Sequence, residues 1–194
     1  MKSKLREDFK KKRAALTPEE VVKKSAEICQ NFITNLLPKI YQKNSVKIFS
    51  LYLTSSNEAS TAKIEKFFTE NKIPFSYPKI IQKNQPLEFI LVEKNLRFAA
   101  NQFYPKILEP INGKKILPDF LILPLLAFDD DLSRLGMGGG FFDRTIEKLK
   151  IQKPNLIIIG LAYDFQRAGA TLPIENTDQK LDFVVTEKNI FARS

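Results

Sequence analysis

The hydrophobic pattern of the first forty residues predicts helices. Apolar residues recur at spacings of three and four, the period that places them on one helical face: Val22, Ala26, Cys29, Ile33 and Leu36. Thr17 precedes Pro18 and stands three residues before Glu20, a combination typical of an N-cap with a capping box. We therefore expect a helix from Thr17 toward Pro38, with Cys29 as core filler, and a Lys-rich, solvent-exposed helix over residues 3–15.

After residue 45 the pattern changes to short apolar runs separated by polar and helical segments. Such runs, rich in Val, Ile, Leu and Phe, are typical of buried strands. The predicted strands are residues 46–53, 87–92, 119–128, 156–163 and 181–186, and the predicted helices are residues 60–70 and 140–150. Strands that are apolar on both faces and alternate with helices indicate an α/β fold.

The expected architecture is a single three-layer domain over residues 1–194, Rossmann-like, with a mostly parallel sheet flanked by helices. A length of 194 residues with 43% hydrophobic content suits one such domain. Ligands of open α/β sheets bind at the carboxyl ends of strands. The loops after Leu53 and after Phe128 are therefore the places where chemistry is expected.

The charge and the residue types limit which chemistry is possible. The net charge of +9 favours polyanionic partners such as nucleotides, nucleic acid or polyglutamylated ligands. One cysteine and no histidine exclude an intrachain disulfide, the usual zinc sites and histidine-based triads. Catalysis is left to carboxylates, Lys, Arg, backbone groups and bound metal.

Targeting signals are weak in this sequence. Glu7 and Asp8 interrupt the basic residues between Lys2 and Lys12, and no apolar segment of a signal peptide follows. No stretch approaches the ~18 apolar residues of a membrane span. We expect a cytoplasmic protein without membrane contact.

Four of the seven glycines lie between a predicted strand and a predicted helix, within residues 134–144 (Arg-Leu-Gly-Met-Gly-Gly-Gly-Phe-Phe-Asp-Arg). Glycines at such a turn let the backbone approach a ligand, and the amides of the helix start then point at an anion. Arg134 could contact the same anion. A nucleotide phosphate site is the leading hypothesis, and a tight turn without a ligand is the alternative. A Walker A loop and a dinucleotide fingerprint both lack required residues here.

This segment resembles the signature of the 5-formyltetrahydrofolate cyclo-ligases, which is Arg-Leu-Gly-x-Gly-x-Gly, two aromatic residues and Asp-Arg. Other matching segments follow in the family's order over nearly the whole chain: Lys2 with Arg6, residues 58–61, Glu109-Pro110, Leu172-Pro173, Asp178 and Asp182. The resemblance implies one cyclo-ligase domain over residues 1–194. It implies an enzyme that uses ATP and magnesium to close 5-formyltetrahydrofolate into 5,10-methenyltetrahydrofolate.

The resemblance also implies residue roles. Residues that would bind ATP come from the amino-terminal segment and the glycine loop: Lys2, Ser3, Lys4, Leu5, Arg6, Arg134, Leu135, Gly136, Met137, Gly138, Gly139, Gly140, Phe141 and Phe142. The folate would contact Leu53, Glu58, Met137 and Phe141. Asp143 and Asp178 would hold Mg²⁺, a hard cation that prefers carboxylate oxygen. Without the resemblance, Lys2 and Arg6 are surface charges, and Glu58 and Asp143 are carboxylates at helix starts.

The implied mechanism is attack of the formyl oxygen on the γ-phosphate, followed by ring closure with loss of phosphate. Phosphoryl transfer needs mainly alignment and charge neutralisation, so histidine is not required. We expect Arg134 to stabilise the transition state. The partners would be ATP and 5-formyltetrahydrofolate, without nucleic acid, and the protein would be a monomer.

Several residues depart from the family pattern. Phe141 and Phe142 replace the usual tyrosines, Leu132 replaces a frequent glycine, and Thr177 replaces a frequent histidine. These changes leave alternatives open: a non-catalytic folate- or nucleotide-binding relative, or an enzyme such as a sugar-phosphate isomerase or CoA transferase on a similar scaffold. A nucleic-acid-binding protein is a further alternative, although no known nucleic-acid-binding module is present.

Overall fold

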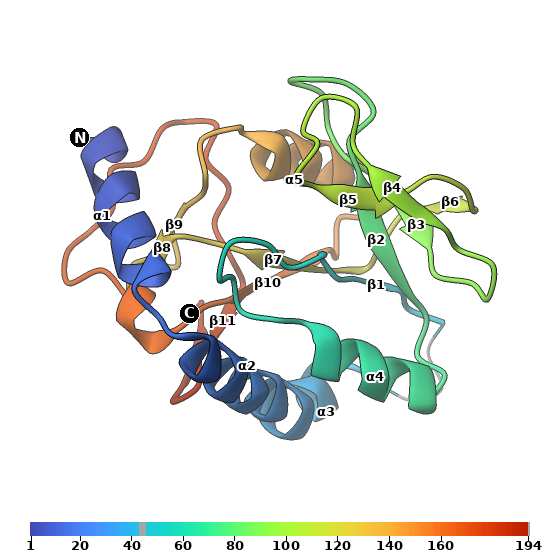
Figure 1. Ribbon diagram of the computed structural model, residues 1–194, viewed down its shortest axis with the longest axis horizontal. Helices are drawn as coiled ribbons and strands as arrows, with labels where there is room; N and C mark the ends of the chain where they lie inside the picture. The colour runs from blue at the N-terminus through green and yellow to red at the C-terminus, as the bar shows by residue number, and fades with distance from the viewer. Residues whose placement is uncertain (43–45, 194) are drawn as a thin grey trace.

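The computed structural model describes residues 1–42 and 46–193, and its centre is an eight-stranded mixed sheet (Figure 1). Its strands, in order across the sheet, are β12 (Ile190–Ala192), β11 (Phe183–Val185), β10 (Ile157–Leu161), β7 (Phe120–Pro124), β1 (Phe49–Ser50), β2 (Phe75–Lys79), β3 (Glu88–Leu91) and β6 (Lys115–Ile116). The strands from β11 to β2 are parallel, and β12, β3 and β6 join antiparallel. The carboxyl ends of the parallel strands therefore share one edge.

Helices cover both faces of this sheet (Figure 1). One face carries α2 (Pro18–Asn31), the π-helical turn η1 (Phe32–Leu36), α3 (Leu37–Ile40) and α4 (Ala62–Glu70), and the other carries α5 (Phe141–Gln152). Each face has its own buried apolar cluster, the first around Phe32, Phe49 and Phe68 and the second around Leu123, Ile146 and Leu149. The arrangement confirms the predicted α/β fold with a mostly parallel sheet between helices.

The remaining elements surround this framework. Helix α1 (Lys2–Ala14) lies beside a two-stranded hairpin of β8 (Ala127–Phe128) and β9 (Arg134–Leu135), and buries Phe9 against Leu126, Leu135 and Leu172. A second hairpin consists of β4 (Phe98–Ala100) and β5 (Leu108–Pro110), and η2 (Asp164–Gln166) is a 3₁₀ turn. In the part of the chain that the structure describes, no helix is long and apolar enough to cross a membrane.

The start of α2 has the predicted capping box. The Thr17 hydroxyl accepts a hydrogen bond from the Glu20 amide (3.2 Å), and the Glu20 carboxylate accepts one from the Thr17 amide (2.9 Å). The helical segment continues through η1 to Ile40. Cys29 is buried as expected, and burial raises the pKa of its thiol to about 11. Cys29 is therefore a packing residue rather than a thiolate nucleophile.

Two details of the predicted pattern are wrong. Val22 is 70% exposed, because the buried face of this helix is set by the larger side chains Ile28, Phe32 and Leu36, four residues apart. The rest of the predicted stripe faces the core at least in part, since Cys29 and Leu36 are buried and Ala26 and Ile33 are half-buried. The run 119–128 is also not one strand, since β7 ends at Pro124 and the chain then leaves the central sheet to form β8. The run stays apolar because its second half is buried beneath α1.

The strand predicted at residues 46–53 is confirmed only for Phe49 and Ser50. Residues 51–61 form instead an irregular segment that leads from the carboxyl end of β1 to α4. This segment contains Leu53 and Glu58, so the shortened strand places both at the edge where ligands are expected.

Candidate active site

Four segments meet at the carboxyl edge of the sheet. They are helix α1, the segment 51–61 after β1, the loop 136–140 between β9 and α5, and the segment 172–179 before β11 (Figure 1). Contacts between them join residues that are far apart in the sequence, such as Lys2 with Asp178 and Arg13 with Glu58. All predicted site residues lie in or next to these segments.

The glycine loop has the backbone shape that its composition predicts. Gly138 has φ of +101° and Gly140 φ of +62°, conformations that side chains rarely adopt, and Gly140 is the N-cap of α5. A Cβ atom at Gly140 would lie 2.6 Å from Nη1 of Arg144. Residues 136–139 are exposed, so their backbone is open to a ligand directly before the helix N-terminus. Such a start suits an anion.

Cations from α1 contact this loop and the segment 172–179. Arg6 donates from Nε to the Gly136 carbonyl (3.0 Å). Lys2 lies 2.6 Å from Asp178 and 2.9 Å from Glu175. Burial alone would lower the pKa of Lys2 and raise that of Asp178, but the hydrogen bonds and opposite charges around them together outweigh burial, so the pKa of Lys2 is raised and that of Asp178 lowered. Both groups are held in their charged forms.

Arg134 lies beneath the glycine loop, nearly buried. Its Nη2 donates to Oδ1 of Asp143 (2.7 Å), and its Nη1 donates to the Gln179 carbonyl. Burial lowers the pKa of the guanidinium, and the Asp143 charge opposes that effect. Asp143 also accepts from the Gln179 amide (3.2 Å) and lies in the first turn of α5. Arg134 and Asp143 are therefore partners within the protein, close to the proposed phosphate position.

The two predicted magnesium ligands share this region but differ from a preformed metal site. Over residues 1–42 and 46–193, no cluster of three or more Asp, Glu, Cys or His side chains could hold a metal ion. The hydrogen bonds of each carboxylate fall on one oxygen, Oδ1 of Asp143 and Oδ2 of Asp178. Two carboxylates with a second oxygen each fit Mg²⁺, which is commonly held by one or two carboxylates, phosphates and water.

Glu58 lies near the carboxyl end of α1, where Arg13 contacts it, and is 8% exposed. Its Oε2 accepts from the backbone amide (3.0 Å) and hydroxyl (3.3 Å) of Ser55, so it closes the turn 55–58 rather than capping α4. Burial raises the pKa of this carboxyl, while the Ser55 amide and the Arg13 charge oppose the rise. Leu53 is half-buried in the same segment. Glu58 thus offers a desolvated acceptor beside an apolar side chain.

The aromatic pair after the glycine loop is half-buried, and the ring of Phe141 is packed on two sides. Tyr104 packs edge-on against Phe141 (5.8 Å between ring centroids), and the Arg144 guanidinium lies over the same ring at 5.4 Å. Met137, by contrast, is 53% exposed. Phe141 keeps a packed ring position although it lacks the hydroxyl that is usual in the family.

Leu132 keeps the turn that the family often builds with glycine. Its φ is +55°, its side chain is 1% exposed, and its amide donates to the Asp129 carbonyl (3.1 Å). A left-handed non-glycine residue costs about 1–2 kcal/mol. Burial of the leucyl side chain offsets a cost of that size. The departure at Leu132 therefore leaves the turn before Arg134 intact.

Arg13 is a site residue that the sequence analysis missed. It is 3% exposed, lies 3.9 Å from Oε1 of Glu58, and donates to the sulfur of Met137 (3.9 Å). A signal for its burial was present, because Arg13 follows the apolar Phe9 by four residues and Leu5 by eight, which places all three on one helical face.

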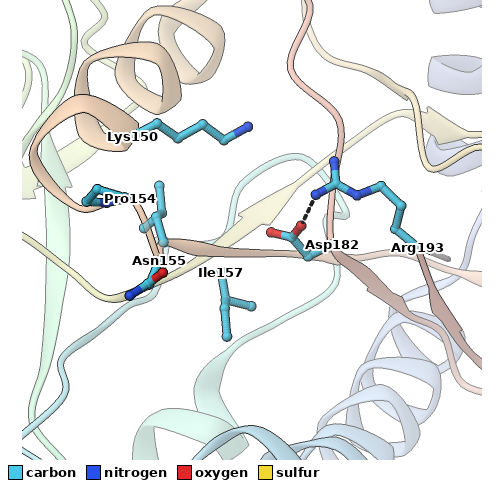
Figure 2. Close-up of a pocket in the computed structure, with 7 residues that line it drawn as sticks. Lys150, Pro154, Asn155, Ile157, Asp182 and Arg193 are labelled. Carbon is cyan, nitrogen blue, oxygen red and sulfur yellow. Dashed lines mark hydrogen bonds and ion pairs between the residues drawn. The ribbon is translucent and has the colours of Figure 1, made fainter.

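An open hollow of about 530 Å³ lies elsewhere, at the amino ends of β10 and β11. Figure 2 shows Lys150, Asn155, Ile157 and Arg193 around it, with Arg193 directed at Asp182 rather than into the space. That ion pair is 2.6 Å long. The hollow is separate from the glycine loop. Its charged groups have partners within the protein, since Lys150 donates to Oε1 of Gln179 (3.2 Å) and Arg193 pairs with Asp182.

Comparisons with known proteins agree with the family that the sequence resembles. The model of the 5-formyltetrahydrofolate cyclo-ligase family matches residues 1–187. A 5-formyltetrahydrofolate cyclo-ligase of Haemophilus influenzae is 34% identical over 91% of this chain and 92% of its own. The structure of Aquifex aeolicus 5,10-methenyltetrahydrofolate synthetase superimposes with a TM-score of 0.80 at 28% identity, covering 98% of this chain and 92% of that one.

A second solved structure, a 5,10-methenyltetrahydrofolate synthetase from Mycoplasma pneumoniae, gives a TM-score of 0.72 at 27% identity. It covers 96% of this chain and 98% of its own length. The residues matched by the family model, 1–187, include α1, the glycine loop and the segment 172–179. The chain belongs to the 5-formyltetrahydrofolate cyclo-ligase family.

Proposed function

We propose that this chain is a ligase that uses ATP to close 5-formyltetrahydrofolate into 5,10-methenyltetrahydrofolate, releasing ADP and phosphate. The observation that carries the proposal is the loop 136–140 at the start of α5, which Arg6 contacts, with Arg134 paired to Asp143 in the first turn of that helix and Lys2 paired to Asp178 in the segment 172–179. Backbone amides and cations around one anion position are what phosphoryl transfer requires. Family membership supports the choice of folate as the acceptor.

In this reaction the formyl oxygen forms a bond to the γ-phosphorus, and the bond from that phosphorus to the ADP oxygen breaks. The second folate nitrogen then attacks the formyl carbon, loses its proton, and phosphate leaves as the ring closes. Glu58 would accept hydrogen bonds from the pterin, with Leu53, Met137 and Phe141 beside it. The glycine loop and α1 would align the triphosphate, and Arg134 would neutralise the charge that develops on the transferred group.

The phosphate-binding cations are already occupied by acceptors of the protein itself. Arg134 is paired with Asp143, and Lys2 with Asp178. When the triphosphate binds, Arg134 and Lys2 would turn from these carboxylates to phosphate oxygens. Mg²⁺ would be held by the released Asp143 and Asp178, and when bound it would supply positive charge to the phosphates.

The test of the activity is a rise in the near-ultraviolet absorbance of the methenyl product when the protein, 5-formyltetrahydrofolate, Mg²⁺ and ATP are combined. We expect a rise that depends on ATP. Binding of folate without any rise would favour a non-catalytic relative. Neither binding nor a rise would favour a different enzyme on this scaffold. The monomeric state, cytoplasmic location and lack of nucleic-acid binding stay predictions.

The exchange of partners predicts that Asp143→Asn changes the affinity for ATP in opposite directions without and with Mg²⁺. Without Mg²⁺ the variant should bind ATP more tightly than the unchanged protein, because Arg134 no longer has to leave a carboxylate. With Mg²⁺ it should bind ATP more weakly, since one ligand of the cation is lost. In the unchanged protein, Mg²⁺ should change the affinity for ATP by roughly 5- to 150-fold, the usual range of coupling between two bound ligands. Titration calorimetry with ATP, with and without Mg²⁺, measures all four affinities.

Asp130→Asn is the matched control, because the carboxylate of Asp130 also pairs with an arginine, Arg167, at a distance of 2.7 Å. This pair lies outside the glycine loop. It should leave all of these affinities unchanged. Equal ATP affinity of the unchanged protein and Asp143→Asn, both with and without Mg²⁺, would refute the exchange.

A further inference from the structure

Arg13 is a deeply buried charged side chain near the two ligand positions. Only 3% of the residue is exposed, although it lies in a helix whose neighbouring residues Lys11 and Lys12 are exposed. A guanidinium carries five N–H donors and is almost never buried without a partner. Its location therefore has to be explained by what it contacts.

The contacts of Arg13 come from both halves of the site. Nη1 lies 3.9 Å from Oε1 of Glu58, in the segment after β1, and Nη2 donates to the sulfur of Met137, in the glycine loop (3.9 Å). The Arg13 carbonyl accepts a hydrogen bond from the Asn57 amide group (3.4 Å). One side chain thus spans the space between the carboxylate assigned to the pterin and the loop assigned to the phosphates.

The partner that needs Arg13 most is Glu58. Among residues 1–42 and 46–193, the other ionisable groups that face this carboxylate are the phenols of Tyr52 and Tyr163, from the segments after β1 and β10, and neither brings positive charge. The Tyr163 hydroxyl is directed at the Glu58 backbone carbonyl (3.2 Å) instead of at the carboxylate. Burial favours the protonated form of Glu58, and the Arg13 charge opposes it.

We infer that Arg13 is a positioning residue for the folate. It keeps Glu58 ionised and oriented for the donors of the pterin, and it ties the pterin position to the glycine loop through Met137. Arg13 acts on the substrate through Glu58 and does not itself take part in phosphoryl transfer. The inference rests on the proposed function for its kinetic test, but the pairing of Arg13 with Glu58 can be measured without any activity.

The kinetic test compares Arg13→Met with the unchanged enzyme over a range of pH. The KM for 5-formyltetrahydrofolate should rise by roughly ten- to a hundredfold, the loss of one hydrogen bond to a charged acceptor, with kcat and the KM for ATP little changed. Without Arg13 the pKa of Glu58 rises further, so the fall of kcat/KM toward acid should begin at a higher pH. Arg13→Lys keeps the charge and should restore most of the folate affinity.

Lys11→Met is the matched control, because it removes a cation from the same helical turn while leaving the pair with Glu58 intact. It should leave the KM for folate and the pH profile unchanged. The inference is wrong if Arg13→Met has the folate KM and acid limb of the unchanged enzyme. It is equally wrong if Lys11→Met shifts them as much, or if kcat and the KM for ATP change as much as the KM for folate.

The activity-independent test is a double-mutant cycle of stability with Arg13→Met and Glu58→Gln. The folded-state pKa of Glu58 is raised, so its ionisation costs stability as pH rises through that pKa, and protonation at lower pH restores it. Arg13→Met raises this pKa further, so the variant should lose stability mainly at neutral pH. Adding Glu58→Gln should recover it there.

Denaturant unfolding at neutral and acid pH measures this cycle. Equal losses at both values, or strict additivity of the two substitutions, would overturn the inference. If Arg13→Met does not fold, Arg13→Lys and the double variant remain to be measured, and a double variant that folds supports it. An inactive but folded unchanged protein would refute the proposed function and leave the cycle interpretable.

Discussion

Replacing Arg134 with methionine should lower kcat by about 10²- to 10³-fold, the loss of ~2.7–4 kcal/mol that follows removal of one preorganised donor from a charged transition state. The KM for folate should stay close to its original value, because Glu58 contacts Ser55 and Arg13, whereas Arg134 contacts Asp143 and Gln179. Arg134 is positioned for this role by Asp143 at 2.7 Å and by the Gln179 carbonyl. Steady-state kinetics by product absorbance would give both parameters.

The structural consequences of the substitution can be separated from the chemical ones. Asp143 is partly exposed and can be hydrated when its partner is lost, so folding should be retained. Arg134→Met with Asp143→Asn removes the pair as a unit, and it should be at least as slow as the single variant although no charge is left unpaired, since it also loses a proposed ligand of Mg²⁺. Arg167→Met removes an arginine from an ion pair outside the site and should keep full activity. Near-normal turnover of Arg134→Met would show that another group neutralises the transferred phosphate.

Phe49→Ala should destabilise the protein by about 3–5 kcal/mol, as expected for a large side chain removed from a core. Phe49 is fully buried in β1 and stacks on Phe120 at 4.3 Å. Its ring also packs against the rings of Phe68 and Phe32, with ring centroids 4.7 Å and 6.4 Å away. The loss would consume much of the 5–15 kcal/mol by which domains are stable. Denaturant unfolding followed by far-ultraviolet circular dichroism measures it.

Phe98→Ala provides the comparison, because Phe98 is 41% exposed in β4 and packs at its edge against Tyr77. Its loss should cost clearly less than that of Phe49. Equal costs would mean that the cluster around Phe49 is not the centre of the core. β1 has only two residues and leads directly to Glu58, so Phe49 anchors the start of the folate segment as well as the core.

The sequence predicted those parts of the fold that depend on neighbouring residues. The capping box at Thr17 and the start of α5 after the glycines are local patterns, and both are confirmed. The exit of the chain from the sheet at Pro124 was missed, because the residues beyond it remain apolar under α1 and keep the appearance of a strand. Burial beneath another element cannot be read from a local run of hydrophobic residues.

The family resemblance predicted which residues belong to the candidate site. Neither the resemblance nor the sequence pattern predicted which of these residues contact one another. Lys2 and Asp178 are 176 residues apart, and only the folded chain brings them to 2.6 Å. Arg13 belongs to the helix that the sequence predicts to be Lys-rich and solvent-exposed. Its burial depends on Glu58 and Met137, which come from two other segments. The roles of Arg134, Glu58, Asp143 and Asp178 stay predictions for the experiments above.

The way α1 is attached to the rest of the molecule has a consequence for the solvent in which the enzyme works. Its apolar contacts are few, mainly Leu5 and Phe9, whereas Lys2, Arg6 and Arg13 join it to three other segments through charged or polar groups. Dissolved ions screen such attractions but leave the apolar contacts unaffected or strengthened. Ionic strength therefore acts on the more exposed of these contacts, such as Lys2 with Glu175, and less on the buried pair of Arg13 with Glu58. It becomes a variable of catalysis in its own right.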